Sequence, residues 1–306
     1  MKIGTVVVPT DFSDESHKAL RYASALVRKL GANLHVVHVG EVDFAVPGPA
    51  LPGTNPLSSD TEQARALKAV IGKSISVAFH GRTGRAFDQI VRVARELEAD
   101  LIVMSTHGRT GLKRLFLGSN AERVVQHSSS PVLVVRRGEE RQIDDAQLFR
   151  IQTILVPTDF SSSSKEGLEY AVKFGRHFGA RLVLFHSFTI PEVLTADPYA
   201  TGYAQVTSEE ARITAEDQMR EFAESADFGG LHFDTHVTMG RAAEEICDYA
   251  AKQDADLIIT STHGRTGFMH VLIGSVAEHV VRYAHSPVLV VPASVKKVDI
   301  GRPAAD

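Results

Sequence analysis

The chain has 306 residues, of which 43% are apolar and 23% charged, with a net charge of −4 and one cysteine. This composition is typical of a folded globular protein, and the length suits two domains of about 150 residues. The negative charge argues against a dedicated nucleic-acid binder, and a lone cysteine excludes an intrachain disulfide framework. No apolar run reaches the roughly 18 residues of a membrane span, and the N-terminus is a poor signal peptide. We therefore expect a cytoplasmic protein that binds neither nucleic acid nor membrane.

The elements of the first half alternate between apolar runs and helical patterns. Ser13 is expected to cap the first helix and Gly31 to end it. Near-continuous apolar strands that alternate with helices predict an α/β fold: an open five-stranded parallel sheet with helices on both faces. In chain order, the expected elements are a strand at 6–8, a helix at 14–30, a strand at 34–39, a helix at 60–72, a strand near 75–79, a helix at 86–98, a strand at 101–105, a helix near 119–128 and a strand at 132–135.

The second half repeats the first. TVVVPTDFS at 5–13 returns as TILVPTDFS at 153–161, and STHGRTG occurs at both 105–111 and 261–267. The offset grows from 148 to 156, so the second copy has eight additional residues in its middle. Ordered self-similarity of this kind indicates a tandem duplication. The predicted boundaries are domain 1 at 1–137, a charged linker at 138–150, domain 2 at 151–293 and a C-terminal tail at 294–306.

Polar and flexible residues follow the first and fourth strands of each copy. In an open parallel sheet, ligands bind beyond the carboxyl ends of the strands. A glycine-containing loop that leads into a helix N-terminus suits a phosphate chain, and an Asp on the neighbouring strand can accept hydrogen bonds from a ribose or base. The candidate binding residues are Pro9, Thr10, Asp11, Ser105, His107, Gly108, Arg109, Gly118, Ser119 and Asn120 in the first copy, and Pro157, Thr158, Asp159, Ser261, His263, Gly264, Arg265, Gly274, Ser275 and Val276 in the second.

The order of these motifs resembles tandem two-domain members of the universal stress protein family. The PTDFS strand end, the glycine loop, the GS dipeptide before a helix and the final SPVLVV strand all match, over nearly the whole chain. The resemblance implies two Rossmann-like, adenine nucleotide alpha hydrolase-like domains with strand order 3-2-1-4-5. It also implies that Asp11 and Asp159 contact the nucleoside, and that the backbone near Val39 and Ser187 meets the adenine edge.

The same resemblance implies a ligand, a function and a way of pairing. The family's nucleotide-binding loop is similar to G-x2-G-x9-G-[ST]; Gly108 and Gly118-Ser119 match its later positions, whereas Ser105 and Ser261 replace its first glycine. The implied cofactor is ATP or AMP, with Mg as a candidate ion, and the implied role is a stress-response sensor or regulator. Because family members commonly dimerise through the last strand, we expect strands Pro131–Val135 and Pro287–Val291 to pair, either as an intrachain pseudo-dimer or in a homodimer.

Two other functions remain open at this point. A nucleotide-free dimerisation scaffold is favoured by Ser105 and disfavoured by Gly108 and Gly118-Ser119. A slow ATP hydrolase is the other alternative, although the chain lacks G-x-x-x-x-G-K-[ST] and has no visible partnered nucleophile. We therefore expect no catalytic residue and at most a weak ATPase. Asp11 and Asp159 could also merely organise a strand-to-helix turn, and the glycines could be plain turn glycines.

Histidine pairs that are close in sequence do not predict a metal site. His35 and His38 are three residues apart on a strand, so they point to opposite faces. His232 and His236 share a face but lie about 13 Å apart at 3.3 Å per residue. Neither pair can chelate one ion locally, and no metal is expected.

Overall fold

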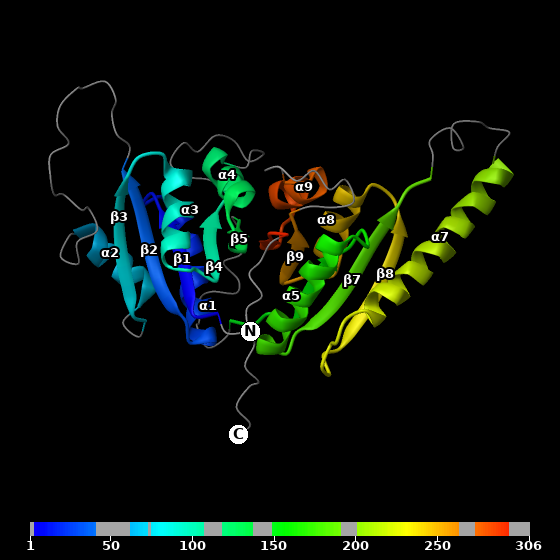
Figure 1. Ribbon diagram of the computed structural model, residues 1–306, viewed down its shortest axis with the longest axis horizontal. Helices are drawn as coiled ribbons and strands as arrows, with labels where there is room; N and C mark the ends of the chain where they lie inside the picture. Colours follow the sequence, from blue (N-terminus) through cyan, green and yellow to red (C-terminus); the bar gives the residue numbers. More distant parts are fainter. Residues whose placement is uncertain are drawn as a thin grey trace. The chain divides into compact units, whose positions relative to one another are not determined.

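The computed structural model describes residues 3–40, 62–72, 75–106, 118–136, 149–190, 201–262 and 273–293. The chain divides into two compact units between Arg150 and Ile151, called domain 1 and domain 2 below (Figure 1). In the described part of each unit, five parallel strands form a sheet that carries helices on both faces. This arrangement confirms the α/β architecture expected from the alternation of strands and helices.

Domain 1 follows the expected alternation element by element. Its strands are ordered β3-β2-β1-β4-β5, which confirms the order 3-2-1-4-5. Helices α1 and α2 pack against each other, whereas α3 packs with α4. The elements are β1 (Thr5–Thr10), α1 (Asp14–Leu30), β2 (Asn33–Gly40), α2 (Glu62–Ile71), β3 (Val77–Thr83), α3 (Ala86–Glu96), β4 (Leu101–Ser105), α4 (Ser119–His127) and β5 (Val132–Val135).

Domain 2 repeats this architecture, with the order β8-β7-β6-β9-β10. Helix α5 packs on β6 and β9, and α8 packs with α9. The elements are β6 (Thr153–Pro157), α5 (Ser162–Phe178), β7 (Arg181–Phe188), α7 (Thr201–Glu224), β8 (Phe233–Met239), α8 (Ala242–Lys252), β9 (Leu257–Ser261), α9 (Ser275–Tyr283) and β10 (Val288–Val291).

The first helix of each domain is bounded as its sequence predicts. The Ser13 side chain accepts a hydrogen bond from the Ser16 amide, and Gly31 ends α1 in the left-handed conformation with φ +65°. Ser161 and Gly179 do the same for α5. A hydroxyl cap satisfies an amide that the helix itself leaves unpaired, and glycine adopts positive φ without a Cβ penalty.

The core strands are apolar because both faces of each sheet are covered. Val6, Val7 and Val8 of β1 have no exposed surface, and all residues of β5 and β10 are buried. At the edge of the domain 1 sheet where the strands begin, Asp100 Oδ2 accepts hydrogen bonds from the amides of Gly4 (2.7 Å) and Thr5 (3.0 Å). In domain 2, Asp256 Oδ2 accepts in the same way from Gln152 and Thr153. These bonds fix the start of β1 against β4, and of β6 against β9.

The third strand was predicted near 75–79, but β3 runs from Val77 to Thr83. Its second half, His80-Gly81-Arg82-Thr83, is polar, so the hydrophobic pattern does not mark it. Backbone pairing with β2 extends the strand to Thr83, which pairs with Gly40. Tertiary pairing therefore overrides the local pattern here.

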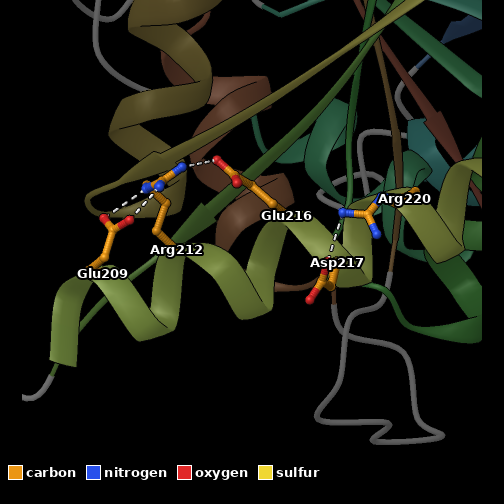
Figure 2. Close-up of polar contacts among 5 residues, drawn as sticks. All are labelled: Glu209, Arg212, Glu216, Asp217 and Arg220. Carbon is orange, nitrogen blue, oxygen red and sulfur yellow. Dashed lines mark hydrogen bonds and ion pairs between the residues drawn. The ribbon is translucent and has the colours of Figure 1, made fainter. Parts of the chain in front are cut away.

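The additional residues of the second copy lie between β7 and β8. There α7 has 24 residues, whereas α2 at the same place in domain 1 has 10. Arg212 bonds both Glu209 and Glu216, and Arg220 bonds Asp217 at 2.8 Å (Figure 2). Pairs at i,i+3 and i,i+4 support a helix that exposes much of its surface. None of the helices in the described part of the chain is long and apolar enough to cross a bilayer.

Candidate functional site

The two candidate segments of each domain lie at one edge of the sheet. β1 pairs in parallel with β4 through Val6 and Leu101, and β6 pairs with β9 through Ile154 and Leu257. Because the carboxyl ends of parallel strands meet at the same edge, the turn after the first strand adjoins the end of the fourth. This adjacency is what the sequence analysis required for a shared site.

The turn after β1 is built around Asp11. Its Oδ1 accepts hydrogen bonds from the Ser13 amide (3.1 Å) and the Ser13 hydroxyl (2.6 Å). Phe12 is held at φ +63°, and its amide donates to Thr10 Oγ1 at 3.1 Å. A positive φ at a bulky residue is strained, so the surrounding bonds must hold it in place.

Domain 2 repeats this turn. Asp159 Oδ1 accepts from the Ser161 amide at 3.1 Å, and Phe160 lies at φ +65°. The Phe160 amide donates to Thr158 Oγ1 at 2.9 Å. Asp11 and Asp159 thus organise the strand-to-helix turn, which is one of the two roles considered from sequence. Each carboxylate remains half-buried at the strand edge.

A histidine that was not among the predicted binding residues anchors each turn. His38 Nδ1 lies 2.8 Å from the Thr10 carbonyl oxygen, and His186 Nδ1 lies 2.8 Å from that of Thr158. Because a carbonyl only accepts, each Nδ1 carries the proton. The rings of Phe12 and Phe160 pack against these imidazoles at 4.5 and 4.3 Å. Recurrence of a histidine at an offset of 148 was the available signal.

The N-terminus of the fourth helix is brought to the end of the fourth strand by a backbone hydrogen bond. The Gly118 amide donates to the Thr106 carbonyl at 2.7 Å, and the Gly274 amide donates to that of Thr262 at 2.8 Å. The following amides of α4 and α9 cannot be satisfied within their helices, because a helix leaves its first N–H groups without an intrahelical acceptor. These amides, with the helix dipole, form the part of the site that suits an anion.

The glycines at these two helix starts are not required by the backbone. Gly118 has φ −60° and ψ 138°, and Gly274 has φ −60° and ψ 145°, which any residue adopts. A Cβ on Gly274 would come no closer than 3.4 Å to its nearest neighbour, the Thr262 carbonyl oxygen. Among the described residues, a side chain at Gly274 would thus make an ordinary van der Waals contact with that oxygen.

The remaining predicted residues differ in their exposure and in their contacts. Thr10 and Thr158 are buried, and their hydroxyls bond Ser16 and Ser164. Ser187 donates its hydroxyl to the Gly240 carbonyl at 2.6 Å. The half-buried residues along the strand ends are Pro9, Val39, Ser105, Pro157 and Ser261, and the exposed ones at the helix starts are Ser119, Asn120, Ser275 and Val276. Outside the described residues lie His107, Gly108, Arg109, His263, Gly264 and Arg265.

Comparison with known proteins agrees with this architecture. The sequence profile of the Universal stress protein family matches residues 2–136 and 150–292. A universal stress protein of Mycolicibacterium smegmatis is 26% identical over 295 residues, covering 94% of this chain and 96% of the relative. A universal stress protein of Methanocaldococcus jannaschii is 33% identical over 142 residues, covering 45% of this chain and 80% of the relative.

Solved structures show the same fold. A universal stress protein from Archaeoglobus fulgidus superposes with a TM-score of 0.63 at 20% identity, covering 96% of this chain and 100% of that one. A functionally unknown protein from Pseudomonas aeruginosa superposes with a TM-score of 0.67 at 18% identity, covering 95% and 93%. At these identities the likeness concerns the fold alone. Together with the profile match across both halves, it shows that this chain belongs to the universal stress protein family, in a tandem two-domain form.

Proposed function

We propose that each domain binds an adenine nucleotide, ATP or AMP, at the carboxyl edge of its sheet. The observation that carries the proposal is the pair of backbone bonds from Gly118 to Thr106 and from Gly274 to Thr262. These bonds hold a helix N-terminus beside the strand end, next to the turn that carries Asp11 or Asp159. Amides and dipole suit the phosphates, and the carboxylate suits the ribose.

The ordinary backbone conformation of the two glycines supports the same assignment. Neither glycine is needed for its φ, and a Cβ at Gly274 meets no closer atom than a carbonyl oxygen at 3.4 Å. A phosphate that sits directly on the helix amides favours glycine at this position, since a side chain would hold the phosphate away. The backbone at Val39 and Ser187, near the ends of β2 and β7, is the proposed adenine contact. Mg is the proposed counter-ion of the phosphates.

We propose that the protein acts as a cytoplasmic stress-response regulator rather than as an efficient enzyme. The strand-end residues that the structure describes are bound into a turn: Asp11 Oδ1 holds Ser13, and His38 Nδ1 holds the Thr10 carbonyl. A general base needs a lone pair aimed at a reacting water. Weak hydrolysis of ATP is the second candidate, and a nucleotide-free scaffold is the third.

The last strands are the proposed pairing surfaces. Within each domain taken by itself, β5 and β10 end the strand order, and both are apolar. A terminal strand presents unpaired backbone groups, so it needs a partner. Pro131–Val135 and Pro287–Val291 would supply it, either within the chain or between two chains.

Titration of the nucleotide-free protein with ATP, followed by calorimetry, tests the binding proposal. We expect saturable binding with two nucleotides per chain. A turnover assay on wild type and Asp11→Ala separates a regulator from a hydrolase, because only a hydrolase releases phosphate above the background rate. Absence of any heat of binding at millimolar ATP would leave the scaffold as the remaining function.

A further inference from the structure

Two histidines that are far apart in sequence meet on the sheet of domain 1. His80 on β3 pairs in register with Val37 on β2, and His35 lies two residues before Val37 on the same strand. Residues two apart on a strand share a face, so His35 and His80 are diagonal neighbours on one face of the sheet. Their ring centroids are 5.2 Å apart and the rings are stacked.

The two imidazoles point nitrogen to nitrogen. His35 Nδ1 and His80 Nε2 are 3.0 Å apart, so one donates a proton to the lone pair of the other. Other histidines of the described chain are held differently, since His38, His127 and His186 each direct Nδ1 at a backbone carbonyl. A histidine–histidine contact instead brings two ring nitrogens together, and both present a lone pair once the shared proton has moved to the far nitrogen of its ring.

This separation is close to that of two imidazoles on one metal ion. Zinc binds imidazole nitrogen at about 2.0–2.1 Å, and a tetrahedral angle then sets the two nitrogens about 3.3–3.4 Å apart. The two nitrogens therefore need to move apart by a few tenths of an ångström, and the rings need to turn so that both nitrogens face one ion. Both residues are half-buried.

We propose that His35 and His80 form a two-imidazole clamp for a late first-row divalent cation such as Zn²⁺. Imidazole is a preferred ligand of these ions, whereas Mg²⁺ and Ca²⁺ prefer oxygen. Both imidazole rings are neutral before and after the metal ion binds. The ring that donates in the free protein moves its proton to its other nitrogen, so that both lone pairs face the ion and no net proton is released.

Neighbouring residues influence the protonation of the two imidazoles and determine which further ligands a metal ion would have. Burial lowers the pKa of His35, and burial together with His35 and Arg82 lowers the pKa of His80, which favours the neutral form that binds a metal ion. Glu96 acts in the opposite direction on His80, but it is bound by Arg82 at 3.0 Å and Arg92 at 3.1 Å. The described residues contain no cluster of three or more His, Cys, Asp or Glu. In the proposed clamp, water takes the remaining positions.

Domain 2 lacks the clamp and supplies a natural control. Val183 stands at the register position of His35, because it lies diagonal to His236 as His35 does to His80. His236 instead packs on Phe185 at 5.5 Å and on Tyr249 at 4.3 Å. A valine in place of His35 is thus already accommodated by this fold in the second copy.

The test is a Zn²⁺ titration of the tag-free, nucleotide-free full chain by calorimetry, comparing wild type, His35→Val, His80→Phe and His236→Val. Wild type and His236→Val should bind one more equivalent of Zn²⁺ than His35→Val and His80→Phe, or bind it at least tenfold more tightly. Mg²⁺ should show no such difference. Identical Zn²⁺ isotherms for all four proteins would overturn the clamp.

Imidazole nitrogen NMR of the wild type gives an answer that does not depend on the variants folding. Zn²⁺ should shift His35 Nδ1 and His80 Nε2 together at one molar equivalent. A shift confined to other histidines would contradict the proposal and leave a neutral, hydrogen-bonded pair. The result is independent of ATP binding, because the clamp and the strand-end site involve different residues.

Discussion

The two domains share their strand-end framework and differ at the second and third strands of the sheet. In both, an Asp holds a Ser, a Phe sits at positive φ and a His binds the first strand's carbonyl. At the second and third strands, domain 1 has a His35–His80 pair, whereas domain 2 has an aromatic cluster around His236. Because the strand-end geometry recurs, the proposed nucleotide site is assigned to both domains, whereas the His35–His80 pair belongs to domain 1 alone among the described residues.

The largest expected effect is on nucleotide binding through the two helix-start glycines. Gly118→Ala and Gly274→Ala should each weaken ATP binding at their own site at least about tenfold, about 1.4 kcal/mol, because a methyl group displaces the phosphate. The melting temperature should stay within about 1 °C, since ordinary φ and ψ accept alanine. Calorimetry and thermal melts of each variant and of the double variant measure this.

The same two variants test whether both domains bind nucleotide. If only one variant reduces binding, then only one domain holds nucleotide, and the shared framework is structural in the other. If neither does, the glycines are plain turn residues.

A smaller effect is expected on stability from the strand-end carboxylates. Asp11→Ala and Asp159→Ala each remove the acceptor that holds a serine, which should cost about 1 kcal/mol, or about 2–4 °C in melting temperature. Asp11→Asn and Asp159→Asn are the matched controls, because the amide oxygen still accepts from the serine. Denaturant unfolding measures the loss of stability in each variant. Equal losses for the Ala and Asn variants would show that the carboxylate charge, and not the hydrogen bond to the serine, stabilises the protein.

Much of this framework follows from sequence because its causes are local. Ser13 and Gly31 bound α1 as their types predict, and the apolar run of β4 coincides with Leu101–Ser105. The strand order follows from the family resemblance together with the alternation of elements. Those features depend on neighbours within a few residues or on a repeated pattern.

What the sequence does not reveal depends on register between strands. The contact of His35 with His80 needs β2 and β3 aligned so that Val37 faces His80. The polar second half of β3 hides that strand from the hydrophobic pattern, so neither its end nor the alignment is readable. Likewise, Asp100 caps the amides of Gly4 and Thr5 across 95 or 96 residues. Local patterns carry no information at that separation.

A still smaller effect should come from the serines that replace the family glycine. Ser105→Gly and Ser261→Gly should tighten ATP binding about threefold by removing a Cβ at the strand end. Ser105→Ala and Ser261→Ala keep the Cβ and should leave the affinity close to that of wild type. Titration of the four variants checks this; a gain with alanine would trace the effect to the hydroxyl instead.

The smallest expected effect is a difference in pH dependence between the domains. Burial lowers the pKa of His35 and His80 below the usual value of about 6.5, so the unfolded chain binds more protons below that pH. Their neutral forms contribute stability above about pH 6.5, and this contribution is lost as the pH falls through the lowered pKa values. His35→Val should flatten the slope of unfolding free energy between pH 7.5 and 5.

His236→Val provides the counterpart in domain 2, where burial also lowers the pKa of the histidine. One titrating ring should give a shallower slope than two. An unchanged slope for His35→Val would show that other groups control the acid response of domain 1.

Native mass spectrometry of the full chain with millimolar ATP tests the central assignment most directly. We expect a chain that carries two nucleotide masses, and in either Gly118→Ala or Gly274→Ala the second mass should require a roughly tenfold higher ATP concentration. A chain that keeps its bare mass at saturating ATP would contradict it, and would leave the strand-end geometry with a purely structural role.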